Sequence, residues 1–384
     1  MNDSDQSVLF VHSRDITTPF GTTWPYYITE RLARNYRVHV VCRKRPDRRD
    51  VKDVPTDVVY HDINTGTVNI ISGLLFMLFS TAYAVLLAGL YQYDVVYSFK
   101  YETIQSWLAA RAGNARLVVG LQSVPVEQTR ELLDLDRLSI PTLLYGSYGW
   151  IVRFVLEDAD EVVCLTDGIR QVTEDAFDID LRNAHVIGMG VSTDKFDPDM
   201  SELSGCEPVT VTYLGTIQST RGLDHVLKSI AGADYDIRSR IVGSGRDSDI
   251  VDLKRTAADL GLEDRVDWVG LVPHHEVPDL LRSTDIAVSP IADIESYRIS
   301  FPAKVLEYMA AGCLIIATDI PPHQNLIENG HNGFLYNGTA DGFREVLTKC
   351  VTESPTSVGY EARRTAERYD WECIVERVED VIFP

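Results

Sequence analysis

A lysine and a glutamate stand three residues apart in SFPAKVLEYMAAG, residues 300–312. Proline is tolerated in the first turn of a helix, so Pro302 predicts a helix that runs to the closing glycine. Lys304 adds positive charge to the positive end of the helix dipole, which is costly unless an anion binds there. Glu307 lies on the same face and can accept hydrogen bonds from sugar hydroxyls. The two residues form either an ordinary surface ion pair or a site for a diphosphate joined to a ribose.

A second candidate for anion binding is YLGTIQSTRGLDH, where Gly215 stands in a turn and Arg221 just before a predicted helix. A helix N-terminus with an arginine suits a phosphate. The alternative is that Gly215 only turns the chain and Arg221 is solvated. A third turn, IVGSGRDSD, contains Gly243. Ser248 replaces the third glycine of a dinucleotide fingerprint there, so a strand-to-helix turn is favoured over a nicotinamide site.

The elements that must position these residues alternate between strands and helices in both halves of the chain. In the first half we predict strands at 7–13, 37–43, 94–99, 116–123, 161–166 and 185–191, with helices at 26–35, 106–113 and 166–177. In the second half we predict strands at 209–215, 235–245, 265–270, 285–291 and 313–318, with helices at 221–232, 249–261, 276–284 and 302–312. One or two further helices are expected within 360–383.

This alternation predicts an α/β protein with two Rossmann-like, doubly wound domains that face a cleft. A segment rich in Pro, Ser, Gly and acidic residues interrupts the pattern near residue 200. We therefore expect an N-terminal domain over 1–196 and a C-terminal domain over 207–365. Residues 366–384 are expected to pack back on the first domain.

Composition restricts the class of protein further. The 384 residues are 45% hydrophobic and carry a net charge of −21, from 57 acidic and 36 basic residues. So acidic a chain is unsuited to general nucleic-acid binding, and the balance is typical of a halophilic protein. The six cysteines form no CxxC pair, which predicts reduced thiols and no metal site. The N-terminal residues contain no secretion signal, so a cytoplasmic protein is expected.

The motifs resemble those of retaining glycosyltransferase family 4, glycosyl transferases group 1, which has the GT-B fold. The resemblance is carried by HVIGMGVSTDKFDP, by YLGTIQSTRGLDHVLKSI, by the block from RIVGSG to DIAVSPI, by FPAKVLEYMAAGCLIIAT and by NGHNGFLY. The first half is similar more loosely, chiefly through ADEVVCLTDGIRQ. This resemblance implies that the second half binds a nucleotide-sugar donor and the first half an acceptor.

Roles for single residues follow from the resemblance. Arg221 and Lys304 would neutralise the donor diphosphate and help the nucleotide leave, and Glu307 would bind the ribose. No metal or cofactor would be needed, because the cations and the helix N-terminus stabilise the leaving group. The remaining donor-side residues would be Gly215, Gly243, Val272 near the base, and Ser300, Phe301 and Ala303 near the sugar. The acceptor side would contain Phe20, Gly21, Thr22, His12 and Gln122.

Three positions depart from the family pattern. Ile299 stands where a second glutamate is common, and Glu295 is displaced from that place by four positions. Thr216 replaces a basic residue of the donor loop, and Gln122 replaces a histidine. No acid-base residue can therefore be named, although the leaving phosphate could itself take the acceptor proton.

Residues 63–93 contain no charged side chain. Three models remain open for this segment: a transmembrane span, a buried core helix, or one helix or helical hairpin lying in a membrane surface. The third is favoured, with Arg43, Lys44, Arg45, Arg48 and Arg49 as contacts for lipid headgroups. It suits an acceptor carried on dolichyl or polyprenyl phosphate and a peripheral location on the inner face of the cell membrane.

The sequence thus predicts a membrane-associated retaining glycosyltransferase. It would move a hexose-type sugar from a nucleotide-diphosphate donor to a lipid-linked glycan or polysaccharide. Two alternatives stay open: a nucleotide-sugar epimerase on the same fold, and an inactive transferase-like binding protein, which the residues Ile299, Thr216 and Gln122 favour. His274 and His275 are interpreted as helix caps or surface groups.

Overall fold

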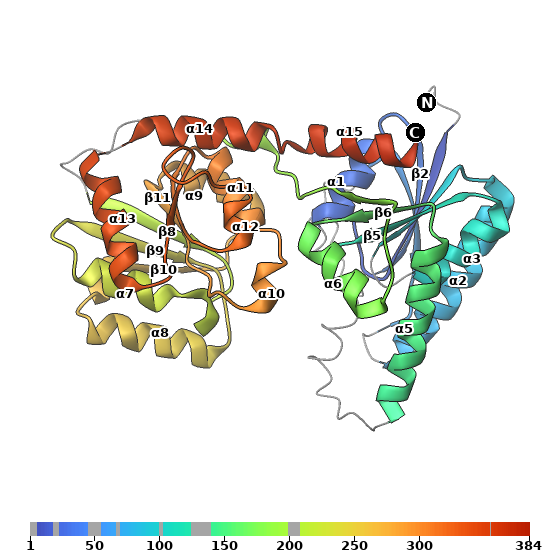
Figure 1. Ribbon diagram of the computed structural model, residues 1–384, viewed down its shortest axis with the longest axis horizontal. Helices are drawn as coiled ribbons and strands as arrows, with labels where there is room; N and C mark the ends of the chain where they lie inside the picture. The colour runs from blue at the N-terminus through green and yellow to red at the C-terminus, as the bar shows by residue number, and fades with distance from the viewer. Residues whose placement is uncertain are drawn as a thin grey trace. The chain divides into compact units, whose positions relative to one another are not determined.

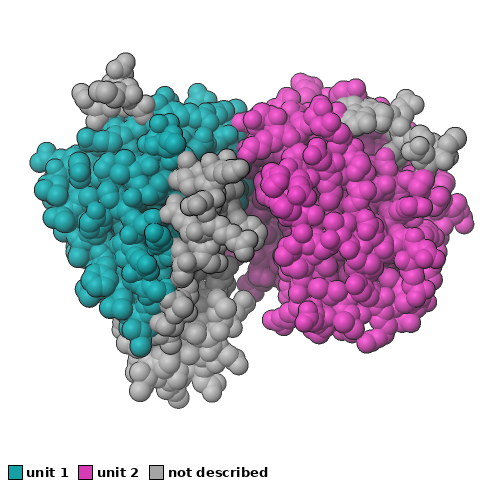
Figure 2. Space-filling model, turned by 180° about the vertical axis from the view of Figure 1, so that it is seen from behind, with its two compact units in different colours: residues 1–189, 371–384 teal, residues 190–370 magenta. Residues whose placement is uncertain are grey.

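The chain divides into two compact units, coloured separately in Figure 2. Unit 1 comprises Met1–Met189 with Trp371–Pro384, and unit 2 comprises Gly190–Asp370. The division after Met189 falls earlier in the chain than the boundary expected at 196. The structure, a computed structural model, describes residues 6–17, 23–44, 55–66, 70–99, 103–123, 140–198, 208–353 and 355–384.

Unit 1 contains a parallel sheet of seven strands in the order β3-β2-β1-β4-β5-β6-β7. The strands are β1 (Ser7–His12), β2 (Arg37–Arg43), β3 (Val58–Ile63), β4 (Val95–Phe99), β5 (Arg116–Leu121), β6 (Glu161–Cys164) and β7 (Ala184–Val186). The helices are α1 (Thr23–Leu32), α2 (Ile70–Tyr91), α3 (Thr103–Gly113), α5 (Ile140–Asp158), α6 (Asp167–Phe177) and α15 (Trp371–Ile382). Every residue of β1 is buried, as its continuous apolar sequence requires of a central parallel strand.

Two elements of unit 1 are absent from the sequence-based assignment, β3 and α5. The predicted cap of α6 is present, because the Thr166 hydroxyl accepts a hydrogen bond from the Ile169 amide at 3.1 Å. The C-terminal helix α15 packs on α1, where the rings of Tyr27 and Trp371 stack with centroids 4.8 Å apart. The chain therefore returns to unit 1 to complete it.

Unit 2 contains a parallel sheet of six strands in the order β10-β9-β8-β11-β12-β13, of which β10, β9, β8 and β11 are labelled in Figure 1. The strands are β8 (Val209–Leu214), β9 (Ile237–Val242), β10 (Val266–Gly270), β11 (Ile286–Ser289), β12 (Leu314–Thr318) and β13 (Phe334–Tyr336). The helices are α7 (Leu223–Ala231), α8 (Asp247–Asp259), α9 (Val277–Arg282), α10 (Glu295–Arg298), α11 (Ala303–Ala310), α12 (Pro321–Gln324), α13 (Ala340–Glu353) and α14 (Thr356–Glu367). Each sheet thus has the doubly wound order that the alternating pattern predicts, and together they form a two-domain α/β fold.

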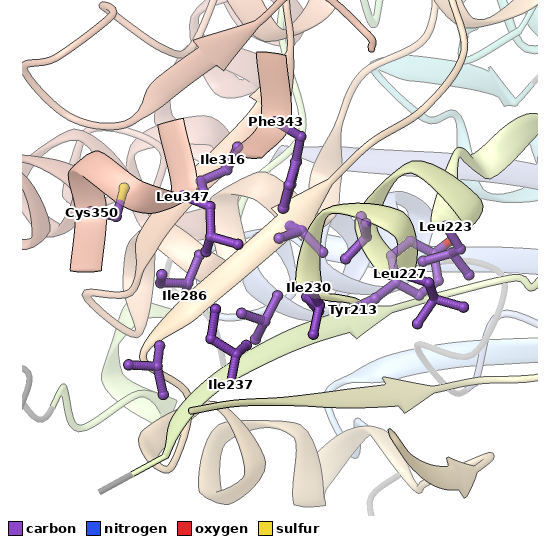
Figure 3. Packing of buried hydrophobic residues seen from close by; sticks show 14 of the residues in the cluster. Tyr213, Leu223, Leu227, Ile230, Ile237, Ile286, Ile316, Phe343, Leu347 and Cys350 are labelled. Carbon is purple, nitrogen blue, oxygen red and sulfur yellow. The ribbon is translucent and has the colours of Figure 1, made fainter. Parts of the chain in front are cut away.

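The core of unit 2 fills the space between one face of its sheet and the helices α7 and α13 (Figure 3). Leu223, Leu227 and Ile230 come from α7 at helical spacing, and all three are buried. Phe343 and Leu347 of α13 meet them over the strands. This packed layer fixes the strands whose carboxyl ends carry the candidate site.

Helix α2 turns its large apolar side chains outward. A stripe at every fourth position, Ser72, Phe76, Ser80, Ala84 and Ala88, is buried. The large apolar side chains that the helix exposes are Ile71, Leu74, Leu75, Met77, Leu78, Phe79, Tyr83, Leu86, Leu90 and Tyr91. A helix surrounded by water has a polar outer side, so α2 shows the reverse arrangement.

The neighbouring helices extend this exposed surface. Helix α2 packs along α3, which in turn packs along α5, and Figure 1 shows the three helices as one layer. On α5 the side chains of Trp150 and Phe154 are exposed, and their rings stack at 6.2 Å. We call the exposed apolar residues of α2 together with Trp150 and Phe154 the outer apolar face.

The structure distinguishes between the three models for the charge-free segment. Helix α2 is a single helix that is long and apolar enough to cross a membrane, but only 33% of its most apolar window is buried, so the model of a buried core helix is wrong. It connects β3 to β4, which belong to one sheet. A crossing would separate these strands of one sheet by a bilayer, which argues against a transmembrane span.

Candidate functional site

The candidate site of unit 2 lies where its strand order reverses. Strand β8 has β9 on one side and β11 on the other, which makes the β8–β11 junction a topological switch point. Ligands of open α/β sheets bind beside the carboxyl ends of the strands at such a point. Arg221 follows β8, and Lys304 follows β11. The two cations therefore reach the same place from two different strands.

Two glycines make room at this place. Gly215 has a φ of +144°, and a Cβ there would lie 1.9 Å from the Lys304 Nζ. Gly243 has a φ of +134°, and its Cβ would lie 1.8 Å from the Gly215 carbonyl oxygen. A side chain at either position would collide with the site or with the backbone that forms it. Both positions predicted as donor-side turns therefore have a steric reason to be glycine.

Lys304 is a largely buried cation at the start of α11. Pro302 forms the N-cap of the helix rather than its first turn, and Lys304 is the second helical residue. Its Nζ lies 5.8 Å from the ring centroid of Tyr213. Burial, followed by repulsion from Arg221, lowers the pKa of Lys304 to about 8, although Glu307 acts in the opposite direction. A strongly shifted pKa of this kind is typical of residues in functional sites.

Arg221 is held by an aromatic side chain instead of a carboxylate. It ends the short 3-10 helix Ser219–Arg221, and its guanidinium lies 4.6 Å from the ring centroid of Tyr297. The Tyr297 hydroxyl is 2.9 Å from the Thr220 hydroxyl, which ties the ring to the same loop. The Nε of Arg221 is buried and has no hydrogen-bond partner within the described residues.

The two cations at the switch point are not paired with a carboxylate of the described residues. Among the residues that the structure describes, neither Arg221 nor Lys304 forms an ion pair. Two neighbouring cations repel each other, and a buried cation without a partner is unfavourable. A ligand with two or more negative charges would remove both penalties, so the arrangement is suited to a diphosphate.

Glu307 lies one turn after Lys304 on α11 and has a partner that the sequence does not predict. Its Oε1 is 3.0 Å from the Nε2 of His274, which begins the 3-10 helix His274–Glu276 after β10. The hydrogen bond to Glu307 raises the pKa of His274, although burial opposes it. The interpretation of His274 as a cap or surface group is therefore incomplete, whereas the side chain of His275 is 82% exposed.

The remaining donor-side residues lie on the loops around these groups. Val272 follows β10 and packs partly on the core below α11. The Ser300 hydroxyl is used within its own turn, where it donates to the Tyr297 carbonyl at 2.8 Å. Phe301 also packs partly on the core, and Ala303 begins α11. Tyr297 and Tyr213 belong to this group of side chains but have no sequence spacing that predicts them.

The positions that depart from the family pattern place no charge beside the cations. Thr216 is exposed, and its carbonyl accepts a hydrogen bond from the Tyr213 hydroxyl at 2.7 Å. Ile299 is half-buried at the end of α10, and Glu295 is exposed at the start of that helix. Among the described residues, Glu295 forms no ion pair with Arg221 or Lys304.

The predicted acceptor-side residues belong to unit 1. His12 ends β1 and is buried; its Nδ1 accepts a hydrogen bond from the Arg14 amide at 2.9 Å. Gln122 follows β5, and its amide nitrogen is buried without a hydrogen-bond partner in the described part of the chain. Phe20, Gly21 and Thr22 lie outside the described residues, as do Arg45, Arg48 and Arg49.

Comparisons with known proteins cover both units. The family model described as Glycosyl transferases group 1 matches residues 201–365, and the model described as Glycosyltransferase Family 4 matches residues 22–195. Among curated proteins, D-inositol 3-phosphate glycosyltransferases of Mycobacterium bovis and Mycobacterium tuberculosis are 25% identical over 295 residues. That match covers 73% of this chain but only 59% of the relatives' length.

Solved structures share the two-unit fold. HepE of Anabaena in complex with UDP and glucose superimposes with a TM-score of 0.71 at 15% identity, covering 98% of this chain and 99% of its own. Sucrose-phosphate synthase from Thermosynechococcus elongatus gives a TM-score of 0.75 at 17% identity, covering 98% of each chain. Both show that the chain folds as these GT-B proteins do.

Proposed function

We propose, because this chain belongs to the family 4 glycosyltransferases of the GT-B fold, that it is a retaining hexosyltransferase. It takes a hexose-type sugar from a nucleotide-diphosphate sugar and moves it to a lipid-linked glycan or a polysaccharide. The observation that carries the proposal is the pair of cations, Arg221 and Lys304, which flank the switch point of unit 2 and form no ion pair with the residues that the structure describes.

The proposed chemistry uses these groups in the order in which charge develops. The bond between the anomeric carbon and the β-phosphate oxygen breaks, and negative charge grows on the leaving diphosphate. Arg221 and Lys304 stabilise this charge without reorganisation, since both are already in place. The acceptor oxygen bonds to the anomeric carbon on the face that the phosphate leaves, and its proton passes to a phosphate oxygen. Glu307 accepts hydrogen bonds from the ribose, and no step requires a metal ion.

The relatives support a nucleotide-sugar donor. HepE is described with UDP and with UDP-glucose, and the mycobacterial relatives are named for transfer to D-inositol 3-phosphate. From these proteins we infer for this chain only the class of donor, a nucleotide-diphosphate sugar, because the two cations of unit 2 would neutralise a diphosphate.

A nucleoside diphosphate should stabilise the protein more than the corresponding monophosphate. At a hundredfold excess over Kd, binding adds about 2.7 kcal/mol to the free energy of unfolding, which raises the melting temperature by about 5 °C. The measurement is a thermal shift series with UDP, GDP, ADP and their monophosphates, in buffer with EDTA. Nucleotide-sugar turnover is then followed with and without extracted membrane lipids.

The controls separate the proposal from its rivals. Release of nucleoside diphosphate only when lipids are present supports a transferase with a lipid-linked acceptor. Conversion of the sugar without release would identify an epimerase, and binding without turnover would identify an inactive binding protein. If no diphosphate shifts the melting temperature, the proposed donor site is wrong.

The outer apolar face supports a membrane as a further partner. The face is built on a helix of 22 residues without a charged side chain, about 33 Å long. Arg43 lies at the N-terminal end of this helix, where it hydrogen-bonds to Ser72 and stacks over Phe76 of the buried stripe, and Lys44 next to it is exposed. An apolar helix beside basic residues is suited to the headgroup region of an anionic bilayer. We propose that the protein binds there peripherally, on the cytoplasmic side.

Replacing Leu78 by glutamate should weaken binding to phosphatidylglycerol vesicles about tenfold, because a charge would enter the lipid interface in place of an apolar side chain. The Leu78 side chain is 63% exposed on α2. Val251→Glu is the matched control, since Val251 is 53% exposed on α8 of unit 2. Co-sedimentation with vesicles measures both. Equal binding by the two variants, or a wild-type protein that stays in the supernatant, would contradict a membrane role for this face.

A further inference from the structure

The contact between His274 and Glu307 joins two elements that the chain keeps apart. His274 comes from the 3-10 helix after β10, and Glu307 from α11 after β11. The Nε2 and Oε1 atoms are 3.0 Å apart, and the two side chains are 47% and 22% exposed. Of the two consecutive histidines, only His274 reaches Glu307, because His275 lies instead near Glu276 at 3.8 Å.

A glutamate that binds two sugar hydroxyls must present its carboxylate in one orientation. Its side chain has three rotatable bonds, so fixing it costs conformational entropy at the moment of binding unless another group holds it beforehand. Lys304 does not form an ion pair with Glu307 in the described chain, although it lies on the same face of α11. His274 is thus the side chain that orients this carboxylate in the structure.

We propose that His274 is a positioning residue: its bond to Oε1 of Glu307 holds the carboxylate so that Oε2 is available to the ribose hydroxyls of the donor. This inference rests on the proposed donor site. His274, which does not itself contact the nucleotide, thus determines through Glu307 how strongly the protein distinguishes a ribose from a deoxyribose.

The protonation state of His274 should change how strongly it holds the Glu307 carboxylate. The charged groups that face His274 are Glu307 from α11 and Lys195 from the segment Thr193–Lys195, with His275 and Glu276 on its own element. The hydrogen bond that His274 donates to the Glu307 carboxylate raises the pKa of His274, whereas burial and the positive charge of Lys195 oppose this. A protonated imidazole donates a stronger hydrogen bond to a carboxylate than a neutral one. Donor affinity should therefore be higher below the pKa of His274 than above it.

The test compares His274→Ala, His274→Gln and His275→Ala in the full-length protein. Calorimetry with UDP and with 2′-deoxy-UDP, or with the nucleoside diphosphate that gives the largest thermal shift, measures Kd at several pH values. For His274→Ala we expect Kd to rise about tenfold and the preference for ribose over deoxyribose to fall by a similar factor. The KM for the donor should rise while kcat changes little, since the leaving diphosphate keeps its cations.

The two other variants make the result specific. A glutamine at 274 can still donate to a carboxylate, so it should restore part of the affinity but remove its pH dependence. His275→Ala should behave as wild type, because that side chain does not touch Glu307.

If His274→Ala keeps the wild-type affinity, ribose preference and pH profile, the positioning role is overturned while the donor site stands. A wild-type protein that binds no nucleoside diphosphate would overturn the donor site itself, and this inference with it. Melting curves of the three variants without ligand verify that each is folded.

Discussion

Replacing Lys304 or Arg221 by a neutral residue should lower the rate of the proposed sugar transfer about a thousandfold. In the proposed mechanism each residue faces the diphosphate on which negative charge grows as the sugar leaves, and removing one preorganised electrostatic group has an effect of this order. Arg298→Ala is the control, because Arg298 is an exposed arginine of the adjacent α10 that is already paired with Asp293 at 2.6 Å. Transfer rates of Arg221→Ala and Lys304→Met that equal the rate of Arg298→Ala would refute the role of the cations.

Lys304→Met should increase the stability of the protein although it lowers the transfer rate. A loss of activity in this variant therefore cannot come from a loss of fold. The folded protein lowers the pKa of Lys304 from 10.5 to about 8. Between these values the unfolded chain binds more protons, so the stability of the wild type rises with pH over that range. Below pH 8 the folded protein bears the full free-energy cost of holding Lys304 in its charged form, about 3 kcal/mol. The methionine variant should thus unfold at higher urea than wild type at pH 7, and the difference should vanish above pH 10.5.

Gly215→Ala should weaken nucleoside diphosphate binding about a hundredfold while leaving the protein folded. The new Cβ would lie 1.9 Å from the Lys304 Nζ, and the flexible end of the lysine must move away. The ammonium group then leaves the proposed diphosphate position, and a lost charge-assisted contact accounts for an effect of this size. Calorimetric titration of the nucleotide, together with the melting temperature, separates binding from stability.

Gly261→Ala provides the comparison for the backbone strain at Gly215. Gly261 also has a positive φ, +68°, but a Cβ there would meet nothing within 4 Å. Both alanine variants should lose about 1 kcal/mol or somewhat more from the strained backbone. Only Gly215→Ala should lose nucleotide binding; if both variants bind equally well, displacement of the lysine is not the cause.

The predictions that succeeded from sequence alone are those for which local chemistry decides the outcome. The apolar runs at β1 and β8 form central buried strands, and Thr166 caps α6 as its position before the helix indicates. Lys304 and Glu307 share a helical face because their spacing requires it. Such signals lie within a few residues of one another, so tertiary structure is not needed to detect them.

What sequence reasoning missed depends on contacts between distant segments. Tyr297 stacks on Arg221 from another loop, and His274 meets Glu307 from across 33 positions in the chain. No spacing rule connects such pairs. The sequence pattern does not predict strand β3. This strand lies at the edge of its sheet and is only partly buried, so its sequence lacks the continuous apolar run of β1. The outward side of α2 could not be identified either, since its apolar residues cover the whole helix.

The stacking of Tyr27 on Trp371 has a consequence for biosynthesis. The first and last segments of the chain belong to the same unit, and residues 190–370 must be translated between them. At bacterial or eukaryotic elongation rates this takes roughly 10 to 40 s. During that interval the surface of α1 that receives the final helix stays uncovered. Unit 1 can therefore be completed only after α15 has left the ribosome, whereas unit 2 can fold earlier.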